Sequence, residues 1–364
     1  MKYALVTTTI FIPKLLEKYC QNFKENSFKD IEIIVIGDKK TPPEVSKYCE
    51  KLERIYGYQV DYWDVKSQKK WLENYPLLKK YLPWNSVERR IIGYILAFKS
   101  GNDIIISIDD DNFVVDRNYL EVISDLGRKK NVETVNSNTG WYNVCEELQA
   151  EDNRKFYPRG FPFSKRWKNE QLTFKKMNGR LVVQAGMWLL NPDIDAISRL
   201  EKPINVLSVS KKINEGIYLG KDTFCPFNTQ NTAVHRSIIP AWFVSPTLDR
   251  FSDIWGSYII IKISHHLKDL IGFGRPIVKQ DRNEHNLFKD LNSEVFGIRN
   301  TDYFMELLNN INLTQNSYLE CFNEIINGLI NNYKEDKFLY KEDFNIFNDY
   351  LNGMKIWYNI FKNE

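Results

Sequence analysis

Three consecutive aspartates, Asp109, Asp110 and Asp111, directly follow the apolar run "IIISI". Like charges this close repel one another, and burying even one carboxylate is costly unless a partner offsets its charge. Mg²⁺ and Mn²⁺ prefer oxygen ligands and bridge carboxylates to phosphate oxygens. The triplet therefore predicts a divalent metal that stabilises charge on a phosphate leaving group. A solvated acidic turn without a metal is the alternative, and the triplet by itself does not decide between the two.

The elements that must position these acids alternate between strand-like and helix-like segments. Apolar runs rich in β-branched residues predict buried strands, and segments with helical apolar spacing lie between them. The strands are expected at residues 3–10, 31–38, 58–65 and 103–109. The helices are expected at residues 13–26, 42–57 and 86–101. This alternation predicts an α/β domain with a mainly parallel central sheet and flanking helices.

Polar residues stand at the carboxyl ends of three of these strands. Ligands of parallel sheets bind beyond the carboxyl ends of the strands, so segments that end there converge on one edge. The residues at these ends are Thr7, Thr8, Thr9, Asp38 and the acid triplet. The sequence therefore predicts a ligand-binding edge to which three separate segments contribute.

The pattern becomes irregular between residues 130 and 295, where short apolar runs mix with many aromatic residues. Beyond residue 300, helical spacing returns in three segments, at residues 301–312, 318–333 and 343–363. We expect a catalytic domain over residues 1–295 and a helical appendage over residues 296–364.

Composition and charge exclude several classes of protein. The net charge of +3 is too balanced for a nucleic-acid binder, which carries a basic patch or stripe. The five cysteines are scattered and form no CxxC pair, so we expect reduced thiols in a cytoplasmic protein. No apolar run approaches the ~18 residues that span a bilayer, so no transmembrane segment is expected. Peripheral association with a membrane and an oligomeric state are left open.

Several blocks of the sequence resemble the STELLO-type glycosyltransferases, and they follow one another in that family's order. The blocks are "VIGDKKTP" (35–42), "RRIIGYILAFKSG" (89–101), "IDDDN" (108–112), "PRGFPF" (158–163), "PFNTQNT" (226–232) and "SDIWGSY" (252–258). The resemblance implies a GT-A-like fold, in which an Asp-x-Asp motif ends a strand and carries the metal that clamps the sugar-nucleotide diphosphate. The acid triplet satisfies that motif.

The chain is also similar to the reversibly glycosylated polypeptides that act as UDP-arabinopyranose mutases. The shared blocks are the Arg-x-x-Gly-Tyr helix (90–94), "RGFPFSKR" (159–166) and "GMWLLNPDIDA" (186–196). The two resemblances together cover residues 3–290 in several blocks. The sequence departs from the mutases where they carry a tryptophan–histidine pair, because Lys279-Gln280 stands there instead, with His285 nearby.

These resemblances imply roles for individual residues. Asp109 and Asp111 would hold the metal, with His285 as a further candidate ligand. The residues expected to bind the nucleotide sugar are Thr7, Thr8, Thr9, Asp38, Arg90, Asp110, Asp193, Asp195, Asn228 and Gln230. The residues expected in catalysis are Asp253, as a base or orienting carboxylate, and Arg159 and Arg166, through electrostatic contact. Arginine stays protonated and is a poor nucleophile, which argues against a covalent role.

Some of these residues have an equally simple structural explanation. Asp38 and Asp253 could cap a turn or a helix, and Arg90 could lie on a solvated helix face. His285 could belong to an exposed loop. Adjacent helical residues diverge by ~100°, so the pair His265-His266 is not spaced for one metal and is interpreted as structural.

The function expected from the sequence is metal-dependent transfer of a sugar to a glycan or lipid-linked acceptor. The donor would be a nucleotide-diphosphate sugar, with a UDP-sugar favoured, and the metal would be Mn²⁺ or Mg²⁺. A pyranose–furanose mutase acting on a nucleotide sugar is the first alternative. A non-catalytic partner that binds a sugar nucleotide without turnover is the second.

Overall fold

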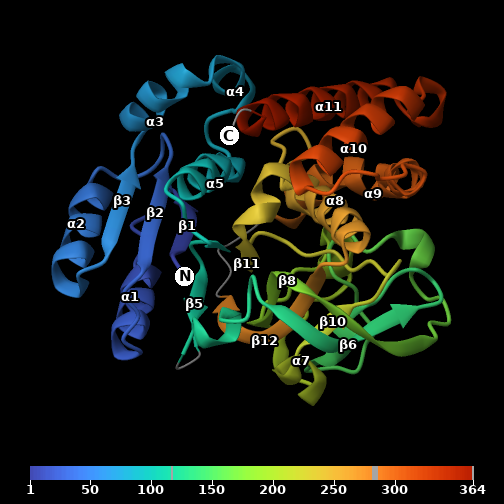
Figure 1. Cartoon of the computed structure of the whole chain (residues 1–364), viewed down its shortest axis with the longest axis horizontal. Helices are drawn as coiled ribbons and strands as arrows, with labels where there is room; N and C mark the ends of the chain where they lie inside the picture. Colours follow the sequence, from blue (N-terminus) through green and yellow to red (C-terminus); the bar gives the residue numbers. More distant parts are fainter. Residues whose placement is uncertain (116–117, 281–285, 363–364) are drawn as a thin grey trace.

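The parallel half of the central sheet is built from four strands within the first 108 residues (Figure 1). The computed structural model describes residues 1–115, 118–280 and 286–362. The parallel strands are β1 (Tyr3–Thr9), β2 (Ile31–Gly37), β3 (Gln59–Trp63) and β4 (Ile104–Ile108), in the order β3-β2-β1-β4. Successive side chains of a strand point to opposite faces of the sheet, so these apolar strands contribute side chains to a hydrophobic layer on each face.

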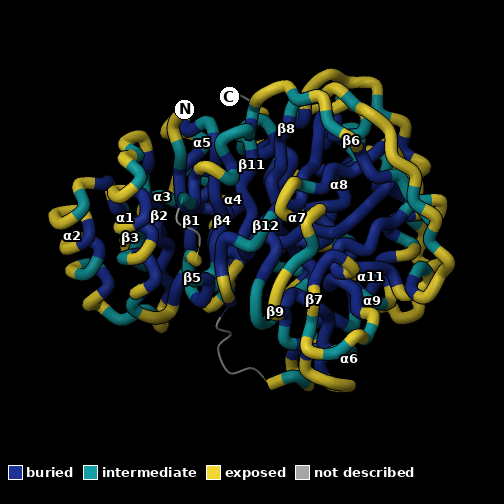
Figure 2. The backbone as a smooth tube through the Cα atoms, turned by 90° about the horizontal axis from the view of Figure 1, so that it is seen from below, coloured by how far each residue is buried: buried dark blue, intermediate teal, exposed yellow. Residues whose placement is uncertain are grey.

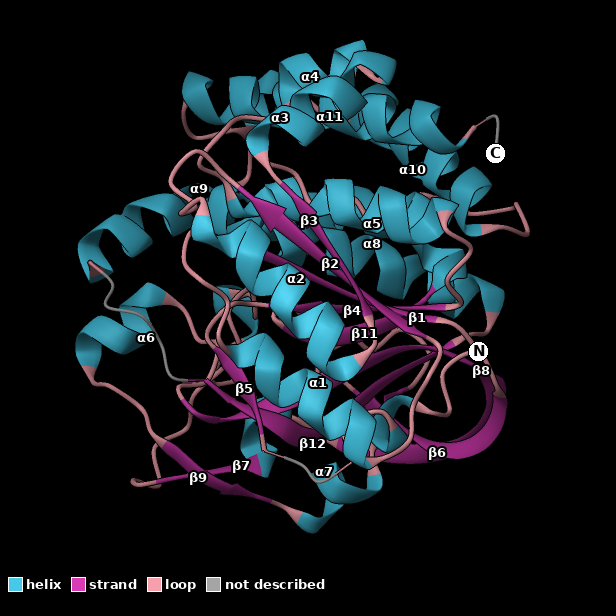
Figure 3. Cartoon of the chain, turned by 90° about the vertical axis from the view of Figure 1, so that its left-hand side faces the viewer, coloured by secondary structure: helices cyan, strands magenta, loops and turns pink. Residues whose placement is uncertain are grey.

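Helices cover both faces of this parallel half (Figure 3). The helices of the region are α1 (Leu15–Glu25), α2 (Glu44–Tyr56), α3 (Val65–Trp71), α4 (Pro76–Tyr81) and α5 (Arg90–Lys99). Leu5 and Ile33 pack in the layer of α1 and α2, whereas Val6 and Ile36 pack in the layer of α5. Gly93 lets α5 approach the sheet closely, because a Cβ there would lie 2.4 Å from a Val6 methyl carbon.

The second half of the sheet is mixed. Its strands are β5 (Asn112–Val114), β6 (Lys129–Ser137), β8 (Leu172–Leu190), β10 (Ile217–Leu219), β11 (Asn231–His235) and β12 (Leu270–Gln280). β11 lies antiparallel to both β4 and β8, and β8 pairs antiparallel with β6 but parallel with β12. β7 (Leu148–Ala150) and β9 (Val206–Val209) form a small antiparallel pair that joins the sheet through β8. The α/β fold is confirmed: the first four strands are all parallel to one another, and the later strands pair in both directions.

The remaining helices gather on one side of the sheet and share its core (Figures 1 and 2). They are α8 (Ser252–Leu267), α9 (Leu287–Asn309), α10 (Tyr318–Asn332) and α11 (Lys341–Phe361), while the short α6 (Ala196–Glu201) and α7 (Lys211–Glu215) lie elsewhere. Trp255 of α8 stacks on Phe304 of α9 with ring centroids 4.1 Å apart. The expected domain boundary at residues 295/296 falls inside α9, so the division into a domain and an appendage stays a proposal.

Reduced thiols and the lack of a transmembrane segment are two further expectations from the sequence. All five cysteines are buried and none is paired in a disulfide. None of the helices in the described ranges has both the length and the apolar character needed to cross a bilayer.

Candidate active site

A cleft of ≈ 490 Å³ opens at the carboxyl ends of β1, β2 and β4. Strand register brings these ends together, because Thr9 lies opposite Gly37 and Thr7 lies opposite Ile108. The sequence-predicted residues that line the cleft are Thr8, Thr9, Asp38, Arg90, Asp109, Asp110, Asp111, Arg159, Asp193, Gln230 and Asp253. The sheet thus assembles in one place residues that lie up to 245 positions apart in the chain.

Arg90, in the first turn of α5, holds Asp109. Its Nη2 donates to Asp109 Oδ1 at 2.5 Å, and its Nη1 donates to the Ser107 hydroxyl at 3.1 Å and the Thr229 carbonyl at 3.0 Å. Burial alone would lower the pKa of Arg90, but the Asp109 carboxylate raises it, so the guanidinium stays charged. The Asp109 side chain remains 35% exposed, so its carboxylate is accessible from the cleft.

The other two acids of the triplet have different partners. The Thr9 hydroxyl donates to Asp110 Oδ2 at 2.7 Å, and burial raises the pKa of Asp110 although this hydrogen bond opposes the rise. Asp111 accepts from two amides, Asn112 Nδ2 at 2.9 Å and Gln280 Nε2 at 3.2 Å. Both of these donors are side-chain amides, and they orient the Asp111 carboxylate.

The carboxylates at the end of β4 fit a hard divalent cation. Asp109 and Asp111 offer carboxylate oxygens from either end of the triplet, and both line the cleft. Oxygen ligands of this kind suit Mg²⁺ and Mn²⁺. Within the described ranges, no group of three or more His, Cys, Asp or Glu side chains could hold a metal ion by itself. Phosphate oxygens of a bound ligand are further donors of the kind that such an ion prefers.

At the β2 end of the cleft, Asp38 ties three segments together. Its Oδ1 accepts from the Lys39 amide at 2.6 Å, and its Oδ2 accepts from the Ser86 amide at 3.2 Å. The Asp38 amide donates to the Thr41 hydroxyl at 2.6 Å, and that hydroxyl donates to the Thr9 carbonyl at 2.7 Å. Asp38 thus shapes the wall of the cleft while its side chain also lines it.

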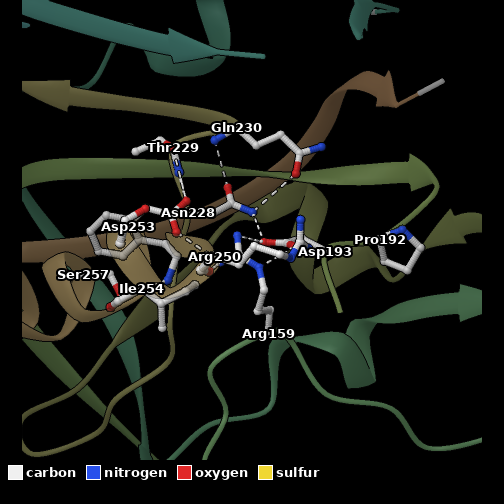
Figure 4. Close-up of polar contacts among 12 residues, drawn as sticks. Arg159, Pro192, Asp193, Asn228, Thr229, Gln230, Arg250, Asp253, Ile254 and Ser257 are labelled. Atoms are coloured by element: carbon white, nitrogen blue, oxygen red, sulfur yellow. Dashed lines mark hydrogen bonds and ion pairs between the residues drawn. The ribbon is translucent and has the colours of Figure 1, made fainter. Parts of the chain in front are cut away.

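On the opposite wall, Arg159 joins two acids (Figure 4). Its guanidinium makes two hydrogen bonds to Asp193, from Nε at 2.9 Å and from Nη2 at 2.8 Å. Its Nη1 donates to Asp253 Oδ1 at 3.1 Å and to the Arg250 carbonyl. The second oxygen of Asp253 accepts from the Thr229 amide at 3.0 Å. Burial alone would raise the pKa of Asp193, but Arg159 holds it well below its usual range, so this carboxylate stays ionised.

Amide side chains link this wall to the acid triplet. Asn228 Nδ2 donates to Asp193 Oδ2 at 2.6 Å, and the Gln230 amide N–H donates back to Asn228 Oδ1 at 3.1 Å (Figure 4). Gln230 Nε2 then donates to Asn112 Oδ1 at 3.2 Å, and Asn112 contacts Asp111. A continuous polar network therefore connects the triplet to Arg159. Such a network fixes the relative positions of its charged members.

Comparison with known proteins places the chain in a family. The reversibly glycosylated polypeptide family matches residues 5–364, nearly the full length. The chain belongs to this family. The match covers the cleft, the Arg159 wall and the C-terminal helices together.

The curated relatives of this family member include mutases and glycosyltransferases. UDP-arabinopyranose mutase 2 of Arabidopsis thaliana is 25% identical over 244 residues, which are 65% of this chain and 63% of the mutase. UDP-arabinopyranose mutase 3 of the same plant is 27% identical over 57% of this chain and 54% of the mutase. Its "Probable glycosyltransferase STELLO1" is 22% identical over 51% of this chain and 26% of that protein. The chain thus spans less than two thirds of the relatives it matches.

Solved structures resemble this reversibly glycosylated polypeptide more distantly. Glucosyl-3-phosphoglycerate synthase from Mycobacterium tuberculosis, in complex with Mn²⁺ and UDP-glucose, has a TM-score of 0.40 and 10% identity, covering 82% of this chain and 78% of that one. A mannosyltransferase from Pyrobaculum calidifontis, in complex with GDP-mannose and Mn²⁺, has a TM-score of 0.40 and 8% identity, covering 100% and 88%. At these TM-scores the likeness carries no inference about this family member's own ligands.

Four of the described residues predicted from the sequence do not line the cleft: Thr7, Arg166, Asp195 and Asn228, of which Asn228 contacts the cleft residue Asp193. Thr7 is fully buried in β1. Arg166 pairs with Asp195 at 2.6 Å, and its guanidinium stacks over the Phe163 ring, 3.8 Å from the centroid. Asp195 also caps the N-terminus of α6 by accepting from Ser198, which explains its burial. His285 lies outside the described residues. The Arg166–Asp195 pair therefore anchors the chain next to the cleft rather than lining it.

The cleft also contains residues that sequence reasoning missed. They are Lys40, Glu88, Arg89, Arg199, Asp249, Arg250, Ser252 and Gln280. Glu88 is buried and accepts from the Ser86 hydroxyl at 2.5 Å and the Ser252 hydroxyl at 3.0 Å, and burial raises its pKa. The available signal was "ERR" (88–90), three charged residues in a row at the start of an apolar helix.

Proposed function

We propose that this chain is an enzyme of nucleotide-diphosphate sugars that uses a divalent metal and breaks the bond between the sugar and the diphosphate. The single observation that carries the proposal is the cleft itself. It combines the acid triplet at a strand end with the Arg159–Asp193–Asp253 wall, and the two are linked by buried amides. Membership of the reversibly glycosylated polypeptide family supports it.

In this proposal different parts of the cleft bind the nucleoside, the metal and the sugar. Thr8, Thr9 and Asp38 border the end of β1 and β2, where the nucleoside would bind through hydroxyl and backbone groups. Asp109 and Asp111 would hold Mn²⁺ or Mg²⁺, which supplies Lewis-acid stabilisation of charge on the departing diphosphate. Arg90 would act as a positioning residue, because its donors already hold Asp109 and Thr229.

Arg159 and its partners would bind the sugar end of the donor. Two of the three guanidinium nitrogens, Nε and Nη2, hold Asp193, so the guanidinium is fixed in place before a substrate arrives. A preorganised charge of this kind stabilises developing charge without reorganisation. Asp253 shares its oxygens between Arg159 and Thr229, which favours an orienting role over that of a base. The exposed Asp249 at the cleft wall is the better candidate for accepting a proton from an acceptor hydroxyl.

Glycosyl transfer from a UDP-sugar to a glycan or lipid-linked acceptor is the leading reaction, because a second set of carboxylates lines the cleft beyond the metal pair. A UDP-sugar pyranose–furanose mutase is the second candidate. The match over residues 5–364 and the curated mutases favour it. In a mutase the diphosphate itself would recapture the rearranged sugar, and no acceptor would be needed.

Product analysis separates these reactions. The protein would be incubated with Mn²⁺, a panel of UDP-sugars and a panel of glycan acceptors, and the nucleotides would be resolved by chromatography. Release of UDP that depends on an acceptor identifies a transferase, whereas an isomerised UDP-sugar without acceptor identifies a mutase. A protein that binds UDP-sugars but yields neither product is the non-catalytic partner, and this result would overturn the proposal of an enzyme.

A further inference from the structure

A second pocket, of ≈ 940 Å³, lies at the far end of α8 from the cleft. α8 places Asp253 in the cleft and Lys262 in this pocket, so one helix spans the distance between them. The rest of the wall comes from the end of α9 and from loops at residues 139–141, 164–165 and 221–224. Among the described residues, the two pockets share no lining residue.

Three lysines from three separate segments line this pocket. They are Lys165, Lys221 and Lys262. Burial lowers the pKa of Lys262, although the nearby Asp222 opposes the change. The Lys262 ammonium donates to the Asn309 carbonyl at 3.3 Å, and an ammonium group has three donors to offer. Lys262 is thus partly desolvated, and three ammonium groups that line one pocket favour an anionic ligand there.

His265 adds an unmet polar group to the same pocket. Its Nε2 is buried and has no hydrogen-bond partner within the part of the chain that the structure describes. The ring packs edge-on against Phe224, with centroids 5.5 Å apart. Burial lowers the pKa of His265 to about 4, and Lys262 and Lys221 lower it further against the opposing effect of Asp222. In the tautomer that carries its proton on Nε2, this nitrogen can donate to an acceptor that the described residues do not supply.

Carboxylates on the rim complement these donors. Asp222, Asp302 and Glu306 line the pocket, and Asp302 accepts from the Ser164 hydroxyl at 2.6 Å. Carboxylates accept hydrogen bonds from sugar hydroxyls, and each has capacity for several. We propose that this pocket binds a sugar that carries a phosphate or carboxylate group. The oxyanion would contact Lys262 and His265, and the hydroxyls would contact the rim. The proposal does not depend on the reaction in the cleft.

Isothermal titration calorimetry tests the proposal with three probes: glucose 1-phosphate, glucuronate and neutral glucose. EDTA is present throughout, so that no divalent metal can hold a phosphate in the cleft. At least one anionic probe should bind, glucose should not, and the stronger of the two anions identifies phosphate or carboxylate as the preferred group. Lys262→Met should weaken binding about tenfold or more, because a charge-assisted hydrogen bond is lost. The matched control is Lys268→Met, which removes an exposed lysine just beyond α8.

A second readout does not require a variant to fold. The His265 ring signals in the NMR spectrum of the wild type should shift when the anionic probe is added. The proposal is overturned if neither anionic sugar binds, if glucose binds equally well, or if the His265 signals stay fixed while heat is released. It is also overturned if folded Lys262→Met and Lys268→Met proteins bind with wild-type affinity, because the ligand would then lie elsewhere.

Discussion

Charged side chains of the cleft are held by partners from distant segments. Asp109 of the β4 end is fixed by Arg90 of α5, and Asp193 by Arg159. A charged side chain removed from water destabilises the folded protein unless an opposite charge pairs with it. Removal of one partner therefore leaves the other charge uncompensated. The pairs therefore set where substrate oxygens and phosphates can bind, in addition to supporting the fold.

The acid triplet and most of its companions could be predicted from the sequence because they are local signals. Asp109 follows an apolar strand directly, and Arg159 sits in a short turn with Pro158 and Gly160. The partners could not be predicted in the same way. The contact of Gln280 with Asp111 joins residues 169 positions apart, and strand pairing alone creates it. The position of Arg166 outside the cleft could not be predicted for the same reason, since its pairing with Asp195 is a tertiary contact.

At the residue scale, Glu88 should make stability depend on pH. Its pKa is raised by burial, so the folded state keeps the proton at pH values where the unfolded chain, with a glutamate pKa of ~4.3, releases it. The folded state then binds more protons, and this group makes the free energy of unfolding fall as pH rises through that window. Glu88→Gln removes the titration and can still hydrogen-bond both serines. As the pH rises above 4, the variant should therefore become increasingly more stable than the wild type.

Urea denaturation of both proteins at several pH values measures this difference. If the unfolding free energies of the two proteins change in parallel from pH 4 to pH 7, the assignment of a raised pKa to Glu88 is contradicted.

At the element scale, the turn that carries Arg159 is held tightly against α8. The backbone angle φ of Gly160 is +89°, and a Cβ atom added at this position would lie 2.2 Å from an Ile254 methyl carbon. The Tyr258 hydroxyl donates to the Gly160 carbonyl. The turn and the helix thus form one support for Arg159 and Asp253, which is why the two side chains meet at 3.1 Å.

Gly160→Ala should both destabilise the protein and displace Arg159. The new methyl group would have to move α8, so we expect a loss of about 2–4 kcal/mol in unfolding free energy, in the range of overpacking plus backbone strain. Gly57→Ala is the matched control, since Gly57 also has a positive φ, +79, but nothing lies within 4 Å of its added Cβ. Urea denaturation should show the control losing only about 1 kcal/mol. Equal losses in the two variants would mean that the turn is not packed as described.

At the scale of the whole molecule, the C-terminal helices belong to the same hydrophobic core as the sheet. Phe304 of α9 stacks on Trp255 of α8, and Asp343 of α11 pairs with Arg299 of α9 at 2.5 Å. Helical periodicity, a property of the local sequence, identified α10, α11 and the last part of α9, whereas the first part of α9 was not predicted. The packing partners and the mixed direction of the later strands depend on the folded topology, and no local spacing encodes them.

Because the core is shared, Phe304→Ala should destabilise the molecule as one unit. We expect a loss of about 3–5 kcal/mol and a single transition in calorimetry and circular dichroism, as for a large buried aromatic residue. Phe288→Ala on the same helix is the control, since that side chain is 75% exposed. Two separated transitions, of which only one shifts in Phe304→Ala, would show instead that the tail folds independently.

The central claim is that the cleft binds a nucleoside diphosphate through a divalent metal held by Asp109 and Asp111. Titration of UDP into the protein, with Mn²⁺ or with EDTA, tests it most directly. The account predicts binding with Mn²⁺ that is lost in EDTA and weakened by about tenfold or more in Asp109→Asn and in Asp111→Asn. Binding of equal strength in EDTA, or in both folded variants, would contradict it, as would the absence of any binding by the wild type.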